Sequence, residues 1–280
     1  MSQLLVEFAW PALPRHNVLA YEAAASNWSP ELTTLHEVEA GSNHPIDQAS
    51  RMLAVQSLQR FTRRRDIIVV DVGCSSGFLL EELRQAEPEM ALVGSDFLLQ
   101  PLNMLARRLP GIPLIQFDLR KCPLPDRCVD AVTALNVLEH IDQDAVALRQ
   151  IWRILKSDGL AHIEVPAGAH LYDIYDEHLM HHRRYELKQL AQMAREAGFE
   201  VLKASHLGVL MYPAFAWVKR KNRQFLSRPA EEKQQIVARQ IRTTSHSRTL
   251  RALLRLEIAI GKALSYPCGI RCVIVLRKRD

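Results

Sequence analysis

Short apolar runs alternate with helix-like segments through the middle of the chain. The run at residues 67–72 (IIVVDV) is β-branched and almost free of polar residues, as expected for a strand buried on both faces of a parallel sheet. Six more strands are predicted, at 91–95, 112–117, 129–135, 160–165, 199–205 and 273–276, with helices at 78–86, 101–108, 142–155 and 186–197. The alternation predicts a doubly wound α/β sheet.

The pattern changes after the fifth strand. Residues 170–185 are rich in His, Tyr, Asp and Arg without a clean period, which predicts an irregular loop. The sequence predicts four parts, which are a helical N-terminal extension (1–60), an α/β core (61–206), a helical insertion (207–267) and the last core strand (268–280).

A glycine-rich turn, DVGCSSG at 71–77, follows the first predicted strand. A strand that ends in glycines and opens a helix lets backbone N–H groups approach a ligand closely. A dinucleotide-binding fingerprint needs glycines at offsets zero, two and five, but Ser75 and Phe78 occupy the last two positions. A nicotinamide-dependent oxidoreductase is therefore the less favoured alternative.

The same turn resembles the first motif of class I S-adenosylmethionine-dependent methyltransferases, an acidic residue followed by GxGxG. Asp71, Gly73 and Gly77 match the motif, while Ser75 replaces the middle glycine. Similar segments of that family follow in order, namely Asp96 after the second strand, Asp118 after the third, DAVTALNVLEHI at 130–141 and LKSDGL at 155–160. The resemblance covers residues 65–206.

The resemblance implies a Rossmann-like, seven-stranded methyltransferase sheet with a helical insertion before the last strand, and S-adenosylmethionine as the cofactor. It implies that Asp96 accepts hydrogen bonds from the ribose hydroxyls, that Asp118 lies near the adenine amino group, and that Asn136 lies near the methionine end. The cofactor-binding residues expected from it are Asp71, Gly73, Cys74, Gly77, Asp96, Phe97, Asp118, Leu119 and Asn136.

Structural roles remain open for these acids. Asp71 alone is compatible with capping the next helix, and Asp118 with starting a turn. A non-catalytic binding protein that keeps the methyltransferase fold is also compatible with the sequence.

The segment DEHLMHHRRY at 176–185 is the candidate acceptor-binding loop. It resembles a stretch in a bacterial subgroup of these methyltransferases associated with glycan or lipid-linked sugar pathways, which implies a small-molecule or lipid-linked acceptor. His181 or His182 is the candidate general base, and His140 is a third catalytic candidate that either reaches the acceptor or begins the next helix.

Two other interpretations of this segment stay open. Glu177, His178 and His182 have the chemistry of metal ligands, although we expect no metal ion at the site. The segment is equally compatible with a polar loop whose arginines pair with Asp173, Asp176 and Glu177.

Charge is unevenly distributed along the 280 residues, whose 36 lysines and arginines exceed 31 acids by 5. Residues 219–255 hold 11 of the basic residues and two of the acids, a net charge of +9, so the rest of the chain carries −4. The ordinary composition excludes disordered and disulfide-framework classes. Five cysteines without a CxxC pair, and no signal-peptide pattern, predict a cytoplasmic protein with reduced thiols.

An apolar run at 207–218 directly precedes this basic segment. The run is too short to cross a bilayer, but Trp and Tyr beside lysines suit a membrane interface. Residues 207–255 are therefore a candidate peripheral membrane contact. The alternatives are a solvated helical face and, less favoured because aromatic residues are scarce, a nucleic-acid site. The oligomeric state is not predicted.

Overall fold

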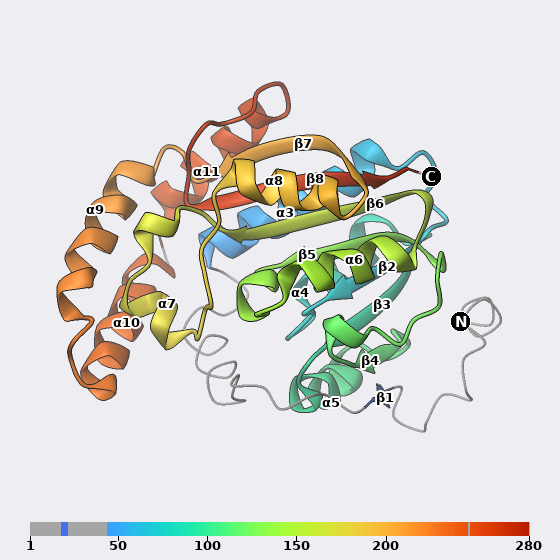
Figure 1. The fold of residues 1–280 in the computed structure, drawn as a ribbon, viewed down its shortest axis with the longest axis horizontal. Helices are drawn as coiled ribbons and strands as arrows, with labels where there is room; N and C mark the ends of the chain where they lie inside the picture. The colour runs from blue at the N-terminus through green and yellow to red at the C-terminus, as the bar shows by residue number, and fades with distance from the viewer. Residues whose placement is uncertain (1–17, 22–43, 246, 280) are drawn as a thin grey trace.

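The computed structural model describes residues 18–21, 44–245 and 247–279, which form a sheet and the helices that cover it (Figure 1). The strands are β1 (Val18–Ala20), β2 (Ile68–Val72), β3 (Ala91–Asp96), β4 (Leu114–Gln116), β5 (Val129–Leu135), β6 (Leu155–Pro166), β7 (Phe199–Leu207) and β8 (Arg271–Lys278). Their order across the sheet is β1-β4-β3-β2-β5-β6-β8-β7. The first six strands in this order are parallel to one another, whereas β8 is antiparallel to both β6 and β7.

The predicted number of seven strands is too low. All seven predicted strands are present, and β1 adds an eighth by pairing with β4, Val18 opposite Leu114. This strand lies in the segment predicted to be helical. The short sequence VLA suits a strand, and β4 would otherwise expose an unpaired edge. Residues 1–17 and 22–43 lie outside the described part.

Helices cover both faces of the sheet. They are α3 (Pro45–Phe61), α4 (Phe78–Ala86), α5 (Leu99–Arg108), α6 (Asp144–Ile154), α7 (Ile174–His178), α8 (Leu187–Glu196), α9 (Tyr212–Asn222), α10 (Ala230–Ser245) and α11 (Arg248–Gly261), with short 3-10 helices η1 (Leu119–Lys121), η2 (Leu138–His140), η3 (Ala169–Leu171) and η4 (Arg223–Phe225). No helix in the described ranges combines the length and the apolar character needed to span a membrane.

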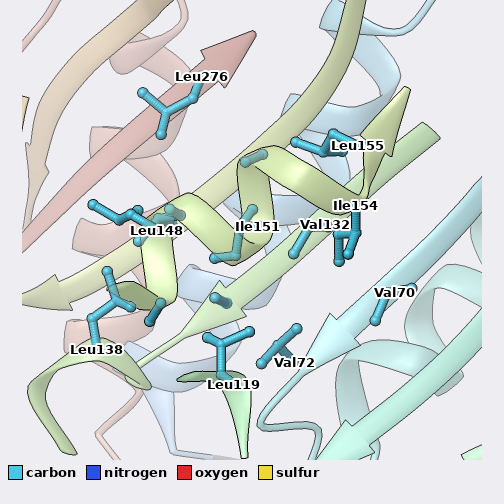
Figure 2. Packing of buried hydrophobic residues seen from close by; sticks show 14 of the residues in the cluster. Val70, Val72, Leu119, Val132, Leu138, Leu148, Ile151, Ile154, Leu155 and Leu276 are labelled. Carbon is cyan, nitrogen blue, oxygen red and sulfur yellow. The ribbon is translucent and has the colours of Figure 1, made fainter. Parts of the chain in front are cut away.

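Alternate residues of one strand pack on opposite faces, as the two-residue period of a strand requires. Val70 and Val72 point to the core under α6, where Ile151 is fully buried (Figure 2). Val69 points the other way, to the core under α3, α4 and α5. Each such buried side chain contributes about 1.5–3 kcal/mol to the free energy of folding. The two layers of helices therefore hold the parallel strands in fixed register.

The segment between β7 and β8 contains α9, η4, α10 and α11. The buried carboxylate of Glu257 on α11 accepts hydrogen bonds from the backbone N–H groups of Gly208, at 2.6 Å, and Val209, at 3.1 Å. Leu254 and Ile258 of α11 belong to a buried cluster that also includes Ala49 of α3. These contacts join α11 to the core.

The prediction of an irregular loop over 170–185 is wrong in part, because the segment contains η3 and α7. Asp173 accepts a hydrogen bond from the Tyr175 N–H at 3.0 Å, and Asp176 accepts one from the Asp173 N–H at 3.1 Å. This reciprocal capping box starts a helix that is too short to give a periodic pattern.

His162, in the middle of β6, makes the stability of the fold sensitive to acid. Its ring is fully buried, and neither nitrogen has a hydrogen-bond partner among the described residues. Burial, with a smaller contribution from the charge of Lys203, lowers the pKa of His162 to about 3. The unfolded chain takes up this proton near pH 6.5, so stability present above that pH is lost as pH falls towards 3.

We therefore expect His162→Leu to flatten the acid side of the stability profile. Between pH 7 and pH 5 the wild type should lose about 2 kcal/mol more unfolding free energy than the variant, at about 1.4 kcal/mol per pH unit below 6.5. Urea denaturation at several pH values measures the unfolding free energies of the wild type and the variant. Parallel profiles would contradict the assignment.

Candidate functional site

The carboxyl ends of β4, β3, β2, β5 and β6 meet along one edge of the sheet, because these strands are parallel neighbours. Ligands of open α/β sheets bind at this edge. The glycine-rich turn leaves it from β2, and the 3-10 helix η2 leaves it from β5 one strand away.

Two glycines give the turn at 71–77 its shape. Gly73 has a φ of +71°, and a Cβ there would lie 2.5 Å from Cγ2 of Val137. Gly77, at the N-cap of α4, has a φ of +69°, and a Cβ there would lie 2.5 Å from Leu105. Both positions therefore require glycine for conformation and for space. Because Val137 follows β5, the contact also joins the turn to the neighbouring strand end.

The Cys74 N–H donates to the Ser95 carbonyl oxygen at 2.9 Å, which fixes the turn against β3. The thiol is buried, and burial together with the nearby carboxylates of Asp96 and Asp71 raises its pKa. Cys74 therefore does not offer a ligand a thiolate.

Asp96 stands at the end of β3. Its Oδ2 accepts a hydrogen bond from the Ser75 N–H at 3.0 Å, and its Oδ1 accepts one from the Leu98 N–H at 2.9 Å. A carboxylate has about four acceptor positions, so capacity remains for ribose hydroxyls. The neighbouring Phe97 holds β4 through its carbonyl oxygen, which accepts from Gln116 Nε2 at 3.1 Å.

Asp71 lies inside the protein, beneath the turn. Thr133 Oγ1 donates to its Oδ1 at 2.7 Å, and burial raises the pKa of Asp71 to about 7. No side chain caps the N-terminus of α4, so Asp71 does not have the helix-capping role that the sequence left open.

Asp118 and Leu119 follow β4. The Asp118 carboxylate caps η1 by accepting from the Arg120 N–H at 2.9 Å, and it pairs with the Arg120 guanidinium at 2.7 Å. Although burial raises the pKa of Asp118, its bonds to Arg120 outweigh burial and lower it overall. Leu119 packs its side chain into the core (Figure 2), which leaves its backbone for a ligand.

Asn136 ends β5 in a left-handed conformation, with φ of +54°. Its N–H donates to the Glu164 carbonyl oxygen at 2.9 Å. This bend turns the chain into η2, which carries Glu139 and His140 at the same edge of the sheet.

Glu139, His140 and His181 converge beside this bend. One potential ligand atom from each lies within 4.8 Å of the others, and the two imidazole rings stand edge to face with centroids 4.8 Å apart. The His182 N–H donates to the Glu139 carbonyl oxygen at 2.8 Å, which fixes the loop to η2. We call Glu139, His140 and His181 the edge cluster.

Asp176 holds His181 in place. Its buried carboxylate bonds His181 Nδ1 at 2.8 Å, Arg184 Nη1 at 2.9 Å and Lys219 Nζ at 3.1 Å. These charge-assisted contacts lower the pKa of Asp176, although burial alone raises it. Burial of His181 lowers its own pKa despite the adjacent carboxylate.

The three catalytic candidates are placed differently. His140 and His181 belong to the edge cluster, whereas the His182 side chain is exposed and only its backbone contacts the cluster. Glu177 pairs with Lys233 at 2.7 Å. Among the described residues, Glu177, His178 and His182 do not form a group with the spacing of metal ligands.

The proposed pairing of arginines with the acids of this segment is only partly right. Arg184 does pair with Asp176, but Arg183 pairs instead with Asp144 at 3.0 Å. Lys219 of the basic segment pairs with Asp173 at 2.6 Å.

Two site features were missed in the sequence. Glu139 is fully buried, and burial raises the pKa of its carboxyl to about 8. Its position in VLEHI, directly after two apolar residues, is a signal of burial. Lys219 is buried beside Asp173 and Asp176, and no local signal separated it from its exposed basic neighbours.

Comparison with known proteins matches residues 47–204 to a family model described as a methyltransferase domain. A Mycobacterium tuberculosis protein named as a probable S-adenosylmethionine-dependent methyltransferase is 25% identical over 194 residues, which cover 68% of this chain and 69% of that protein. A demethylmenaquinone methyltransferase of Deinococcus radiodurans is 30% identical over 141 residues, covering 46% of this chain and 56% of its own.

Solved structures share the fold. Phosphoethanolamine N-methyltransferase 2 of Haemonchus contortus, solved with S-adenosyl-L-methionine, has a TM-score of 0.57 and 14% identity, over 89% of this chain and 57% of that chain. The [4+2]-cyclase SpnF has a TM-score of 0.56 and 17% identity, over 93% of this chain and 99% of that chain. At these identities the likeness shows the fold alone.

The family match spans more than half of the chain and contains the glycine-rich turn and η2. The chain belongs to the methyltransferase-domain family and is an S-adenosylmethionine-dependent methyltransferase.

Proposed function

We propose that the cofactor lies along the sheet edge from β4 to β5 and that the methyl acceptor binds at the edge cluster. The adjacency of the two regions carries this proposal, because Gly73 of the turn packs against Val137, two residues before Glu139. In this arrangement Asp118 lies at the adenine end, Asp96 at the ribose and Asn136 at the methionine end. The strand order then directs the methyl group towards β5 and the edge cluster.

Methyl transfer requires mainly that the acceptor atom be aligned with the methyl group. S-adenosylmethionine supplies a methyl group already activated on a sulfonium, so the protein must hold an acceptor atom in line with the carbon–sulfur bond. The buried Asp71 carboxyl and the fixed glycine turn keep the cofactor side rigid. His140 and His181 are the side chains that we assign to contact the acceptor.

The segment 176–185 and the helices between β7 and β8 support a proposal for the acceptor class. The HHRRY segment resembles the subgroup linked to glycan and lipid-linked sugar substrates, and α9 lies next to that segment through the pairing of Lys219 with Asp173. We propose a small polar or lipid-linked acceptor.

Asp96→Ala should weaken S-adenosylmethionine binding about ten- to a hundredfold, because it removes charge-assisted bonds worth ~1.5–3 kcal/mol. Isothermal titration calorimetry measures the affinity, with NADH as the competing cofactor. Asp66→Ala, which removes an exposed carboxylate just before β2, is the control and should leave the affinity unchanged. Unchanged affinity in a folded Asp96→Ala protein would refute the ribose assignment.

His181→Ala should abolish most methyl transfer while keeping cofactor affinity, because its ring lies at the acceptor end. Transfer of tritium from labelled S-adenosylmethionine into bacterial lipid and water-soluble extracts measures both activity and acceptor class. His206→Ala, whose ring bonds the Tyr266 carbonyl oxygen at 2.9 Å, is the control. Full activity of His181→Ala would remove the edge cluster from the reaction.

We also propose that α9 contacts anionic lipid. Leu210, two residues before α9, is 51% exposed, and Trp217 on α9 is 60% exposed. The Lys221 ammonium lies 4.2 Å from the Trp217 ring centroid. Arg220 and Lys221 are exposed, whereas Lys219 is buried and neutralised. Exposed aromatic and basic groups together favour a membrane interface.

Flotation with phosphatidylcholine vesicles, with and without phosphatidylserine, tests this contact. Lys221→Ala should weaken binding to the anionic vesicles about fivefold, as expected for ~1 kcal/mol per basic side chain, and Trp217→Ala should weaken it as well. Met104→Ala removes an apolar side chain of α5 that is 51% exposed and should have no effect. Flotation that does not depend on phosphatidylserine or on these residues would contradict the proposal.

A further inference from the structure

The Glu139 carboxyl group has no hydrogen-bond partner among the described residues. It is fully buried, and neither oxygen accepts or donates a hydrogen bond within the described residues. Arg184 and Arg271, two cationic side chains whose charges act on Glu139, bond other carboxylates. Arg184 bonds Asp176, and Arg271 bonds Glu164 at 2.7 Å. A buried polar group left without a partner costs about 1–3 kcal/mol, and such groups are usually satisfied by water or an ion.

The two histidines supply the other donors for an ion. Ligand atoms of Glu139, His140 and His181 lie within 4.8 Å of one another. Around zinc, with bonds of about 2.0–2.2 Å, such atoms stand roughly 3.4 Å apart. The ligand atoms therefore need to approach one another by at most about 1.4 Å. Two histidines and one carboxylate form a common set for catalytic transition metals, which keep open positions for substrate.

Hydrogen bonds around the cluster already orient one of these ligands. Asp176 occupies His181 Nδ1 at 2.8 Å, so Nε2 is the ring nitrogen available to a metal. A carboxylate behind a histidine ligand in this way fixes its tautomer and raises its basicity. Arg184 and Lys219 in turn hold Asp176 ionised and in place.

We propose that Glu139, His140 and His181 bind a divalent transition-metal ion that holds an oxygen of the methyl acceptor. The proposal deepens the proposed function and depends on it for the acceptor, while the metal site depends only on these residues. A metal-bound hydroxyl loses its proton to solvent more readily. The oxygen of the acceptor then forms the new bond to the methyl carbon, and the bond between that carbon and the cofactor sulfur breaks. The electron pair of the broken bond stays on the sulfur, which becomes a neutral thioether.

Zinc binding to the chelator-treated full chain tests the site without cofactor or acceptor. Isothermal titration calorimetry should show one ion per chain with micromolar or tighter affinity. Glu139→Gln, which keeps the shape of the side chain, and His181→Ala should each weaken binding at least tenfold. Cobalt in place of zinc gives a visible absorption band that should disappear in both variants. His182→Ala, whose ring is exposed outside the cluster, should bind as the wild type does.

The outcomes separate this proposal from the proposed function. Zinc affinity that is unchanged in folded Glu139→Gln and His181→Ala, or no binding by the wild type, overturns the metal site. Methyl transfer that proceeds undiminished after chelation also overturns the metal's role and leaves the acceptor site standing. Specific zinc binding with no methyl transfer into any extract supports the metal site and counts against the proposed acceptor chemistry alone.

Discussion

The buried carboxylate of Asp176 connects three parts of the protein. It orients His181 of the edge cluster, pairs with Arg184 near the end of the same loop, and accepts a bond from Lys219 of α9. A buried ion pair broken on one side leaves an uncompensated charge, which costs about 3–5 kcal/mol. This carboxylate therefore joins the segment 170–185 to the segment between β7 and β8, together with the Lys219–Asp173 and Lys233–Glu177 pairs.

The sheet contributes a second constraint. Its parallel strands end at one edge, so the glycine-rich turn, Asp96 and η2 lie side by side although they are far apart in sequence. Gly73 and Gly77 keep the turn close to Val137 and Leu105, where any larger residue would collide. Membership of the methyltransferase-domain family follows from this part of the chain. We propose that the loop and helices beyond the core strands select the acceptor.

Local patterns predicted the core well. The apolar run of β2 and the spacing of Gly73 and Gly77 are local signals, and the structure places each as expected. β1 was missed because three residues carry no period, and its pairing depends on the distant β4. The burial of Glu139 and Lys219 arises from tertiary contacts, so the sequence could indicate a chemical type but not a partner. The basic segment 219–255 likewise includes one buried lysine, Lys219, which the sequence does not distinguish from its exposed neighbours.

Cofactor and acceptor are thus assigned to adjacent stretches of one sheet edge, with the edge cluster at the methyl end. A crystal structure of the full chain with S-adenosylhomocysteine measures this arrangement most directly. The ribose should lie at Asp96 and the sulfur between Gly73 and Asn136, with its open side towards Glu139, His140 and His181. A sulfur that faces away from the edge cluster, or a cofactor bound outside the glycine-rich turn, would contradict the assignment.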